Sequence, residues 1–201
     1  ETLIPMLLQK PDNPSSGSPL KRIVLVGDHN QLPPIVKNPA LQNYARMSQS
    51  LFSRLIRLGN PAICLDKQGR ARTELADLYR WRYDKLEDLG MLTDGSAAAY
   101  ELGNPGFAND FQLIDVGTVD TESAPVPFFY QNIIEAEYIA AVYQYMRLLG
   151  YPAETITVLT TYNGQKHLLK DVISARIQWN PTIGMPSKIS TVDKYQGRQN
   201  D

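Results

Sequence analysis

The sequence is poor in the residues on which several classes of protein depend. Its 201 residues include one cysteine, Cys64, and two histidines, His29 and His167. One cysteine can form neither an internal disulfide nor a thiolate zinc site, which excludes a disulfide-stapled scaffold and a zinc finger. Charges nearly cancel, with 20 Lys and Arg against 21 Asp and Glu, so a nucleic-acid binder that relies on massed lysines is disfavoured. No apolar stretch approaches the length of a membrane span, and we expect no membrane partner.

Two motifs of nucleotide and acyl chemistry are also missing. The chain has no G-x-x-x-x-G-K-[ST] phosphate cradle and no G-x-S-x-G nucleophile turn. Cys64 lies in an apolar run, where we expect a small core residue rather than a nucleophile. The chain begins with Glu1 in a segment that already reads as amphipathic, so we expect it to be part of a larger protein.

What the sequence does contain is a globular composition with strong strand and helix patterns. It is 43% hydrophobic and 20% charged, enough to bury a core. The apolar patterns predict strands within residues 23–26, 60–66, 111–116, 155–162 and 188–192. They predict helices over residues 2–9, 48–59, 73–89, 133–149 and 163–177, the fourth of these with a capping box at Asn132 and Glu135. Alternating strands and helices indicate an α/β fold with a parallel sheet.

Three of the predicted strands end in polar clusters: GDHNQ after residue 26, LTTYNGQ after residue 158 and TVDKYQG after residue 190. Open parallel sheets bind ligands beyond the carboxyl ends of their strands, so these clusters predict a ligand site. In the first cluster, Gln31 is placed to sense a phosphate or orient a water, and Pro33 and Pro34 hold the loop beyond it. Arg70 and Arg72, next to a strand end, carry guanidinium groups that can grip a phosphate.

A metal centre is a weaker interpretation of the first cluster. Asp, His and Asn at a strand end are typical of metal-dependent phosphoesterases, in which they ligate two ions. Such a centre needs several histidines, and the chain has only His29 and His167. We therefore predict no metal ligands in this chain, and elemental analysis for bound metal would test that alternative.

Four segments occur in the order found in superfamily 1 helicases of the group that includes the nonsense-mediated-decay helicase. GDHNQLPP resembles motif III of that group, and KQGRAR stands where the group has a Gln-aromatic-Arg motif. TTYNGQ resembles its Thr-Pro-Tyr-x-x-Gln segment, and STVDKYQGR resembles motif V. Further segments, such as FFYQNIIEAEY and LLGYPAETITVLTTYNGQKHL, are similar to intron-binding, spliceosomal members of the group. The resemblance covers nearly the whole chain.

The resemblance implies a RecA-like helicase core. Residues 1–60 would be the C-terminal part of a first RecA-like domain, and residues 61–201 most of a second. ATP would bind between the two domains, with Mg²⁺ held mostly by residues outside this chain, and the isolated chain would be inactive. The whole protein would be an ATP-dependent RNA helicase and hydrolase of the nucleus, acting in pre-mRNA splicing with spliceosomal proteins and single-stranded intron RNA as partners.

The resemblance also implies roles for individual residues. Gln31 and Arg70 would be catalytic, the first as a γ-phosphate contact and the second as an arginine finger. The nucleotide-binding set implied is Asp28, Gln31, Arg70, Gly197 and Gln199. The RNA-binding set implied is Thr161, Tyr162 and Thr191. Gly69, Thr161 and Gln199 depart from the pattern of the group, which leaves an RNA-binding spliceosomal scaffold with a helicase fold and weak or no ATPase activity as the alternative.

Overall fold

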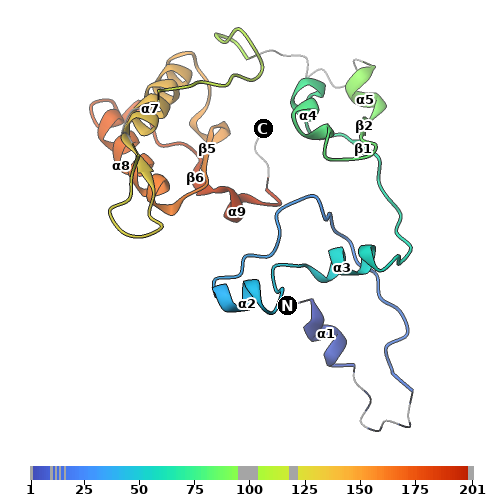
Figure 1. The fold of residues 1–201 in the computed structure, drawn as a ribbon. Coiled ribbons are helices and arrows are strands. Elements are labelled where there is room, and N and C mark those ends of the chain that lie inside the picture. Colours follow the sequence, from blue (N-terminus) through green and yellow to red (C-terminus); the bar gives the residue numbers. More distant parts are fainter. Residues whose placement is uncertain are drawn as a thin grey trace. The chain divides into compact units, whose positions relative to one another are not determined.

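The computed structural model describes residues 2–9, 11, 13, 15, 17–94, 104–117 and 122–198. The chain divides into two compact units, Glu1–Glu101 and Leu102–Asp201 (Figure 1). None of the helices in these ranges is long and apolar enough to cross a membrane. The division of the chain into two RecA-like domains near residue 60 stays a prediction.

The first unit consists of short helices joined by long stretches of coil. Its elements are α1 (Leu3–Leu7), α2 (Pro39–Asn43), α3 (Leu51–Arg57), β1 (Lys67–Gln68), α4 (Thr73–Arg80), β2 (Glu87–Asp88) and α5 (Gly90–Thr93). The strands β1 and β2 pair in parallel, Lys67 with Glu87 and Gln68 with Asp88.

Helix α3 forms where the sequence predicts it because both of its ends are capped. The Ser50 hydroxyl accepts a hydrogen bond from the Ser53 backbone N–H at 3.0 Å. At the other end Gly59 adopts a φ of 76°, which glycine tolerates best. The N–H groups of Gly59 and Asn60 then reach back to the carbonyls of Ile56 and Leu55, so the free carbonyls of the last turn are satisfied.

Three predicted strands are not strands in the structure. Residues 23–26, 60–66 and 111–116 are extended coil without a ladder partner among the described residues. Most of their apolar side chains are exposed, Val26 to 96% and Ile63 to 95%, and Cys64 is exposed rather than part of a core. The prediction was wrong for these segments because a strand needs a neighbour to pair with, and an apolar run does not supply one.

The predicted helix over residues 73–89 was also wrong in its extent. Helix α4 ends at Arg80, and Thr73 is its first residue rather than its cap. The Thr73 hydroxyl donates to the Asp88 carboxylate instead, at 2.9 Å. The segment that was predicted to continue the helix turns back and pairs Glu87–Asp88 with β1, so a tertiary contact overrides the helical pattern.

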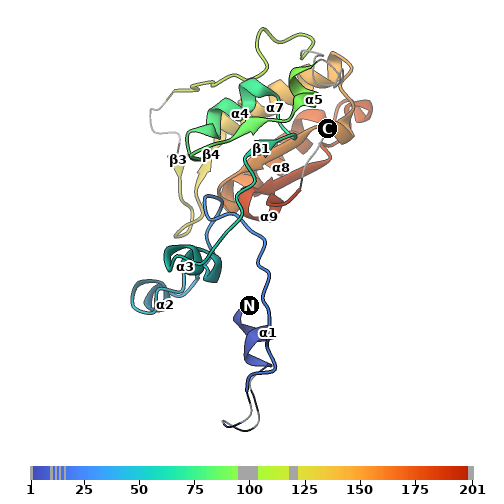
Figure 2. The same ribbon diagram turned by 90° about the vertical axis from the view of Figure 1, so that its right-hand side faces the viewer.

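The second unit has a layer of two long helices against a short parallel strand pair. Its elements are β3 (Glu122–Ser123), β4 (Gln131–Asn132), α7 (Ile133–Leu148), the 3₁₀ turn η1 (Ala153–Thr155), β5 (Thr157–Thr160), α8 (Asn163–Ile177), the 3₁₀ turn η2 (Pro181–Ile183), β6 (Lys188–Thr191) and α9 (Val192–Tyr195). Strands β3 and β4 are antiparallel (Figure 2), whereas β5 and β6 are parallel and joined through α8 (Figure 1).

The core of the second unit lies between α7, α8 and the β5–β6 pair. Tyr143, Leu169 and Ile173 are its largest fully buried side chains. Small residues on α7, Ala136 and Ala140, are also buried in this core, where they allow close helix packing. The βαβ arrangement confirms the α/β class with a parallel sheet that the sequence predicts.

Candidate functional site

The loop that follows residue 26 is organised around one carboxylate, that of Asp28. Its Oδ1 accepts the Asn30 backbone N–H at 2.9 Å, which closes a tight Asx turn. Its Oδ2 accepts two donors, the Gln31 side-chain amide at 2.9 Å and the Tyr83 hydroxyl at 2.6 Å. Asp28 therefore fixes both its own loop and the position of that loop against the segment after α4.

These contacts change the pKa values of the two acidic groups involved. Partial burial raises the pKa of Asp28, but the hydrogen bonds from Tyr83, Asn30 and Gln31 outweigh it and hold that pKa below its ordinary value. Burial and the hydrogen bond to the Asp28 carboxylate raise the pKa of Tyr83 to about 12. At neutral pH the pair is therefore a carboxylate that accepts a hydrogen bond from a neutral phenol.

Gln31 is exposed, and its amide nitrogen is held by Asp28. Within the described ranges its amide oxygen receives no hydrogen bond, so the side chain is oriented at one end and open at the other. This is the arrangement that a γ-phosphate contact or a water-orienting residue requires. Asp28 is different, because three internal donors already occupy its carboxylate. Its predicted contact with a nucleotide stays a prediction.

The turn that carries Arg70 is held by the side chain of Gln68 on β1. The Gln68 carbonyl oxygen accepts the backbone N–H groups of Arg70 and Ala71, at 3.0 and 2.9 Å. Its amide nitrogen donates to the Ala71 carbonyl at 2.8 Å and to the Asp88 carboxylate. One glutamine side chain thus satisfies three backbone groups of the turn.

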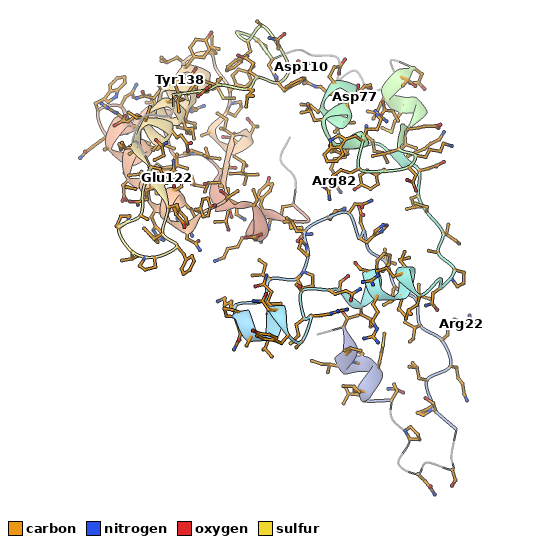
Figure 3. All side chains as sticks on the ribbon, viewed as in Figure 1. Arg22, Asp77, Arg82, Asp110, Glu122 and Tyr138 are labelled. Carbon is orange, nitrogen blue, oxygen red and sulfur yellow. The ribbon has the colours of Figure 1, made fainter. Side chains whose placement is uncertain are left out.

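Asp88 connects this turn to α4. Its carboxylate is buried to 7% exposure and accepts from the Thr73 hydroxyl and from Arg80, whose guanidinium Nη2 lies 3.1 Å from both oxygens. Burial raises the pKa of Asp88, but the hydrogen bonds from Gln68, Thr73 and Arg80 outweigh burial and hold that pKa below its ordinary value. Arg80 also pairs with Asp77, which Figure 3 labels on α4, at 2.8 Å.

The side chain of Arg70 takes no part in this network. It is exposed, and its guanidinium forms no hydrogen bond or ion pair within the described part of the chain. Gly69, which stands where the helicase group has an aromatic residue, approaches Leu89 so closely that an added Cβ would lie 2.5 Å from Leu89 Cδ1. The backbone of Arg70 is thus fixed and its side chain is free within the described residues. Arg70 forms no hydrogen bond with Asp28 or Gln31.

The two threonine-bearing segments do come together. Strands β5 and β6 are adjacent and parallel, with Thr160 opposite Thr191, so Thr161 and Thr191 lie at the same carboxyl edge. Thr161 is exposed, while Thr191 is 4% exposed and its hydroxyl forms no side-chain hydrogen bond within the described residues. Tyr162, 48% exposed, packs edge-to-face on Tyr130 with ring centroids 4.9 Å apart. Two hydroxyls and an aromatic ring therefore share one edge of the strand pair.

The first turn of α8 is locked to the segment before α7. The Gln165 side chain accepts the Asn132 backbone N–H at 2.7 Å and donates to the Asn132 carbonyl at 3.0 Å. Gln131 donates to the Gly164 carbonyl at 3.2 Å, and an added Cβ on Gly164 would lie 2.5 Å from the Tyr130 carbonyl oxygen. Gly164 and Gln165 of TTYNGQ thus anchor the start of α8, and with it the preceding residues Thr161 and Tyr162, to the segment before α7.

The remaining predicted residues lie after β6. Gly197 is exposed with a φ of 79°, and an added Cβ would meet no atom within 4 Å, so only its backbone conformation favours glycine. Gln199 lies outside the described residues. In the part of the chain that the structure describes, no group of three or more His, Cys, Asp or Glu could hold a metal ion.

Sequence reasoning overlooked the residues that hold the site residues in place. Tyr83 lies 55 residues from Asp28, and Gln165 lies 33 residues from Asn132. No local pattern marks such partners. Gln68 lies within KQGRAR, and Gly164 and Gln165 lie within TTYNGQ, so their place in these motifs was the one signal that the sequence offered for them.

Comparisons with known proteins identify the family of the chain. A family model described as an AAA domain matches residues 47–201. The chain belongs to this family. It is 53% identical over its whole length to the RNA helicase aquarius of Mus musculus. It is 37% identical, over 72% of its length, to the pre-mRNA-splicing factor cwf11 of Schizosaccharomyces pombe, and 28% identical, over 90% of its length, to the ATP-dependent helicase upf1 of the same yeast.

These matches confirm the helicase family and its α/β, RecA-like core, and they place the chain near splicing-related members of superfamily 1. The chain spans 13% of the mouse protein and 11% of cwf11. It is thus similar to a small part of each relative.

Proposed function

We propose that this chain is part of the core of an ATP-dependent RNA helicase that acts in pre-mRNA splicing in the nucleus. The observation that carries the proposal is the shared carboxyl edge of β5 and β6, because two segments that resemble helicase motifs end there on adjacent parallel strands. The similarity of the whole chain to a protein named RNA helicase aquarius supports it. Spliceosomal proteins and single-stranded intron RNA are the proposed partners.

The nucleotide side of the proposal rests on Gln31 and Arg70. Gln31 offers an oriented, exposed amide, and Arg70 an exposed guanidinium on a fixed turn, which is what a triphosphate bound between two RecA-like domains would meet. Asp28, Gly197 and Gln199 complete the proposed set. ATP with Mg²⁺ would supply the reacting phosphate, and the metal ligands would lie mostly outside this chain.

The RNA side rests on Thr161, Tyr162 and Thr191. Hydroxyls and backbone amides at a strand edge can bind phosphates without a large positive charge, which fits a net charge of -1. Tyr162 offers an aromatic face beside them, and bases or riboses can pack on such a face.

Changing Thr161 and Thr191 together to valine should weaken the binding of single-stranded RNA by the complete helicase while leaving its thermal stability unchanged. Valine keeps the shape of threonine and removes the hydroxyl, at a typical loss of about 0.5–1.5 kcal/mol per hydrogen bond. Two lost bonds correspond to roughly a five- to 150-fold rise in Kd. Fluorescence anisotropy with a labelled oligoribonucleotide measures it.

Thr157→Val is the matched control, because it removes a hydroxyl at the opposite end of the same strand, where Thr157 faces Ser187 at 3.2 Å. Its RNA affinity should equal that of the wild type. Unchanged affinity in the double variant would mean that both hydroxyls serve the fold alone. It would contradict the proposal that RNA binds at the carboxyl edge of β5 and β6.

The chain by itself should not hydrolyse ATP. It has no phosphate-cradle motif, so it lacks the backbone amides and the lysine that hold the β- and γ-phosphates. Phosphate release from Mg-ATP by the purified chain, with and without RNA, is the measurement, and the complete helicase is the positive control. Turnover by the pure chain that disappears on chelation of the metal would contradict the assignment of the catalytic machinery.

A further inference from the structure

The hydrogen bond between Tyr83 and Asp28 is not part of any motif that the sequence presents. It joins atoms 55 residues apart at 2.6 Å. Asp28 belongs to the predicted first RecA-like domain, and Tyr83 to the predicted second. The contact therefore crosses the predicted domain boundary within one compact unit, Glu1–Glu101.

The bond also lies one step from the proposed phosphate contact. Tyr83 and Gln31 donate to the same carboxylate oxygen, Asp28 Oδ2. Removing one donor therefore changes the position and the charge of the oxygen to which the other donor bonds. The backbone N–H of Asn30 holds the second oxygen and prevents the carboxylate from rotating freely. Removing the phenol leaves Gln31 as the only donor on Oδ2 among the described residues.

The surroundings of Tyr83 connect it to the turn of Arg70 as well as to the loop of Gln31. It follows α4 in the turn that includes Arg82, labelled in Figure 3. Arg80, on the last turn of α4, is anchored to Asp88, whose partner Gln68 orients the Arg70 turn. One end of α4 thus touches the loop of Gln31 through Tyr83 and the turn of Arg70 through Arg80 and Asp88.

We propose that Tyr83 is a positioning residue, which holds Asp28 and through it Gln31 in place, and so couples the Gln31 loop to the turn of Arg70. The inference rests on the proposed function, because it assigns Tyr83 a task in the same nucleotide site. Tyr83 touches neither nucleotide nor RNA in this proposal; it acts through Asp28.

The test compares ATP hydrolysis by the complete helicase with saturating RNA in the wild type, Tyr83→Phe, Asp28→Asn and the double variant. Phenylalanine keeps the ring and removes only the donor. The kcat of Tyr83→Phe should fall about tenfold with less than a twofold change in KM, because the bond orients a group that acts in the transition state. The double variant should lose no more than Asp28→Asn alone, because an asparagine whose one acceptor oxygen serves the Asn30 N–H no longer accepts from Tyr83.

Tyr44→Phe is the control, because Tyr44 is 89% exposed and its loss of a hydroxyl should leave kcat and KM unchanged. An active wild type with an equally active Tyr83→Phe variant would overturn the inference and leave the proposed function standing. A wild type without ATP turnover would contradict the proposed function itself, and the inference with it. Additive losses in the double variant would also overturn the inference, because they would mean that the two residues act separately.

Discussion

Replacing Arg70 with alanine should abolish most of the RNA-stimulated ATP turnover of the complete helicase, and replacing it with lysine should not restore it. An arginine finger stabilises the negative charge that develops on the transferred phosphoryl group, and such fingers contribute about 10³–10⁵-fold to turnover. Lysine keeps the charge but loses the planar fork that binds two oxygens at once. The structure makes Arg70 suitable because Gln68 fixes its backbone while its guanidinium is exposed and unpaired within the described residues.

The measurement is steady-state ATP hydrolysis with saturating RNA, together with the affinity for a non-hydrolysable ATP analogue. Turnover should fall far more than nucleotide affinity, because most ground-state contacts with the phosphates would come from outside this chain. Arg57→Ala is the matched control, since Arg57 is another exposed arginine of the same unit, in the last turn of α3. If Arg70→Ala and Arg70→Lys both keep wild-type turnover, Arg70 is not a catalytic residue. An RNA-binding scaffold with a helicase fold would then account better for the chain.

The parts of the fold that local signals encode were predictable. Helix α8 begins and ends at the predicted residues, Asn163–Ile177. Helix α7 starts at its Asn132 cap, whose side chain accepts the Glu135 N–H at 3.1 Å, and it is followed by Gly150 with a φ of 99°. Caps and glycine stops act within a few residues, so a sequence displays them directly.

The parts that depend on distant partners were not predictable. The apolar run at residues 23–26 has the composition of a buried strand, but a strand exists only where another strand pairs with it. The end of α4 depends on a pairing across about twenty residues, between β1 and β2. In both places the tertiary context, and not the local pattern, decided the structure.

The candidate site divides in the same way. The Asx turn of Asp28 and its contact with Gln31 span three residues and follow from the residue types in GDHNQ. That Thr161 and Thr191 share an edge followed from the parallel order of their strands, which the alternation of elements predicts. The residues that hold this site in place come from distant parts of the chain: Tyr83 bonds to Asp28, and Asn132 bonds to Gln165 beside Thr161 and Tyr162. No local sequence pattern predicts these two pairings.

The close approach at Gly164 leads to the second large effect that we expect, on stability. Alanine is normally the better helix former by about 1 kcal/mol, so the change would stabilise an exposed helix. At Gly164 the added Cβ would lie 2.5 Å from the Tyr130 carbonyl oxygen and 2.9 Å from the Phe129 carbonyl carbon. Both are backbone atoms, which cannot rotate away as the end of a side chain can. The clash therefore outweighs the gain in helix propensity.

Gly164→Ala should lower the free energy of unfolding by about 1–3 kcal/mol, the usual range for forcing extra atoms into a packed site. For a chain of this size each kcal/mol corresponds to roughly 2–4 °C in Tm. Thermal unfolding of the chain followed by far-UV circular dichroism measures it. Gly90→Ala is the matched control, because Gly90 starts a helix with an ordinary φ and its added Cβ would meet only Asp94 Oδ2, at 4.0 Å.

The same substitution should also weaken RNA binding by the complete helicase. To admit the new methyl group, the Tyr130 backbone must move from the first turn of α8, and it carries with it the ring on which Tyr162 packs. Tyr162 would then lose its support beside Thr161 at the edge of the strand pair. A Gly164→Ala variant with unchanged Tm would mean that the segment before α7 is not seated on α8 in solution. A variant with lowered Tm and unchanged RNA affinity, measured well below that Tm, would mean that the Tyr130–Tyr162 contact serves the fold and not the RNA.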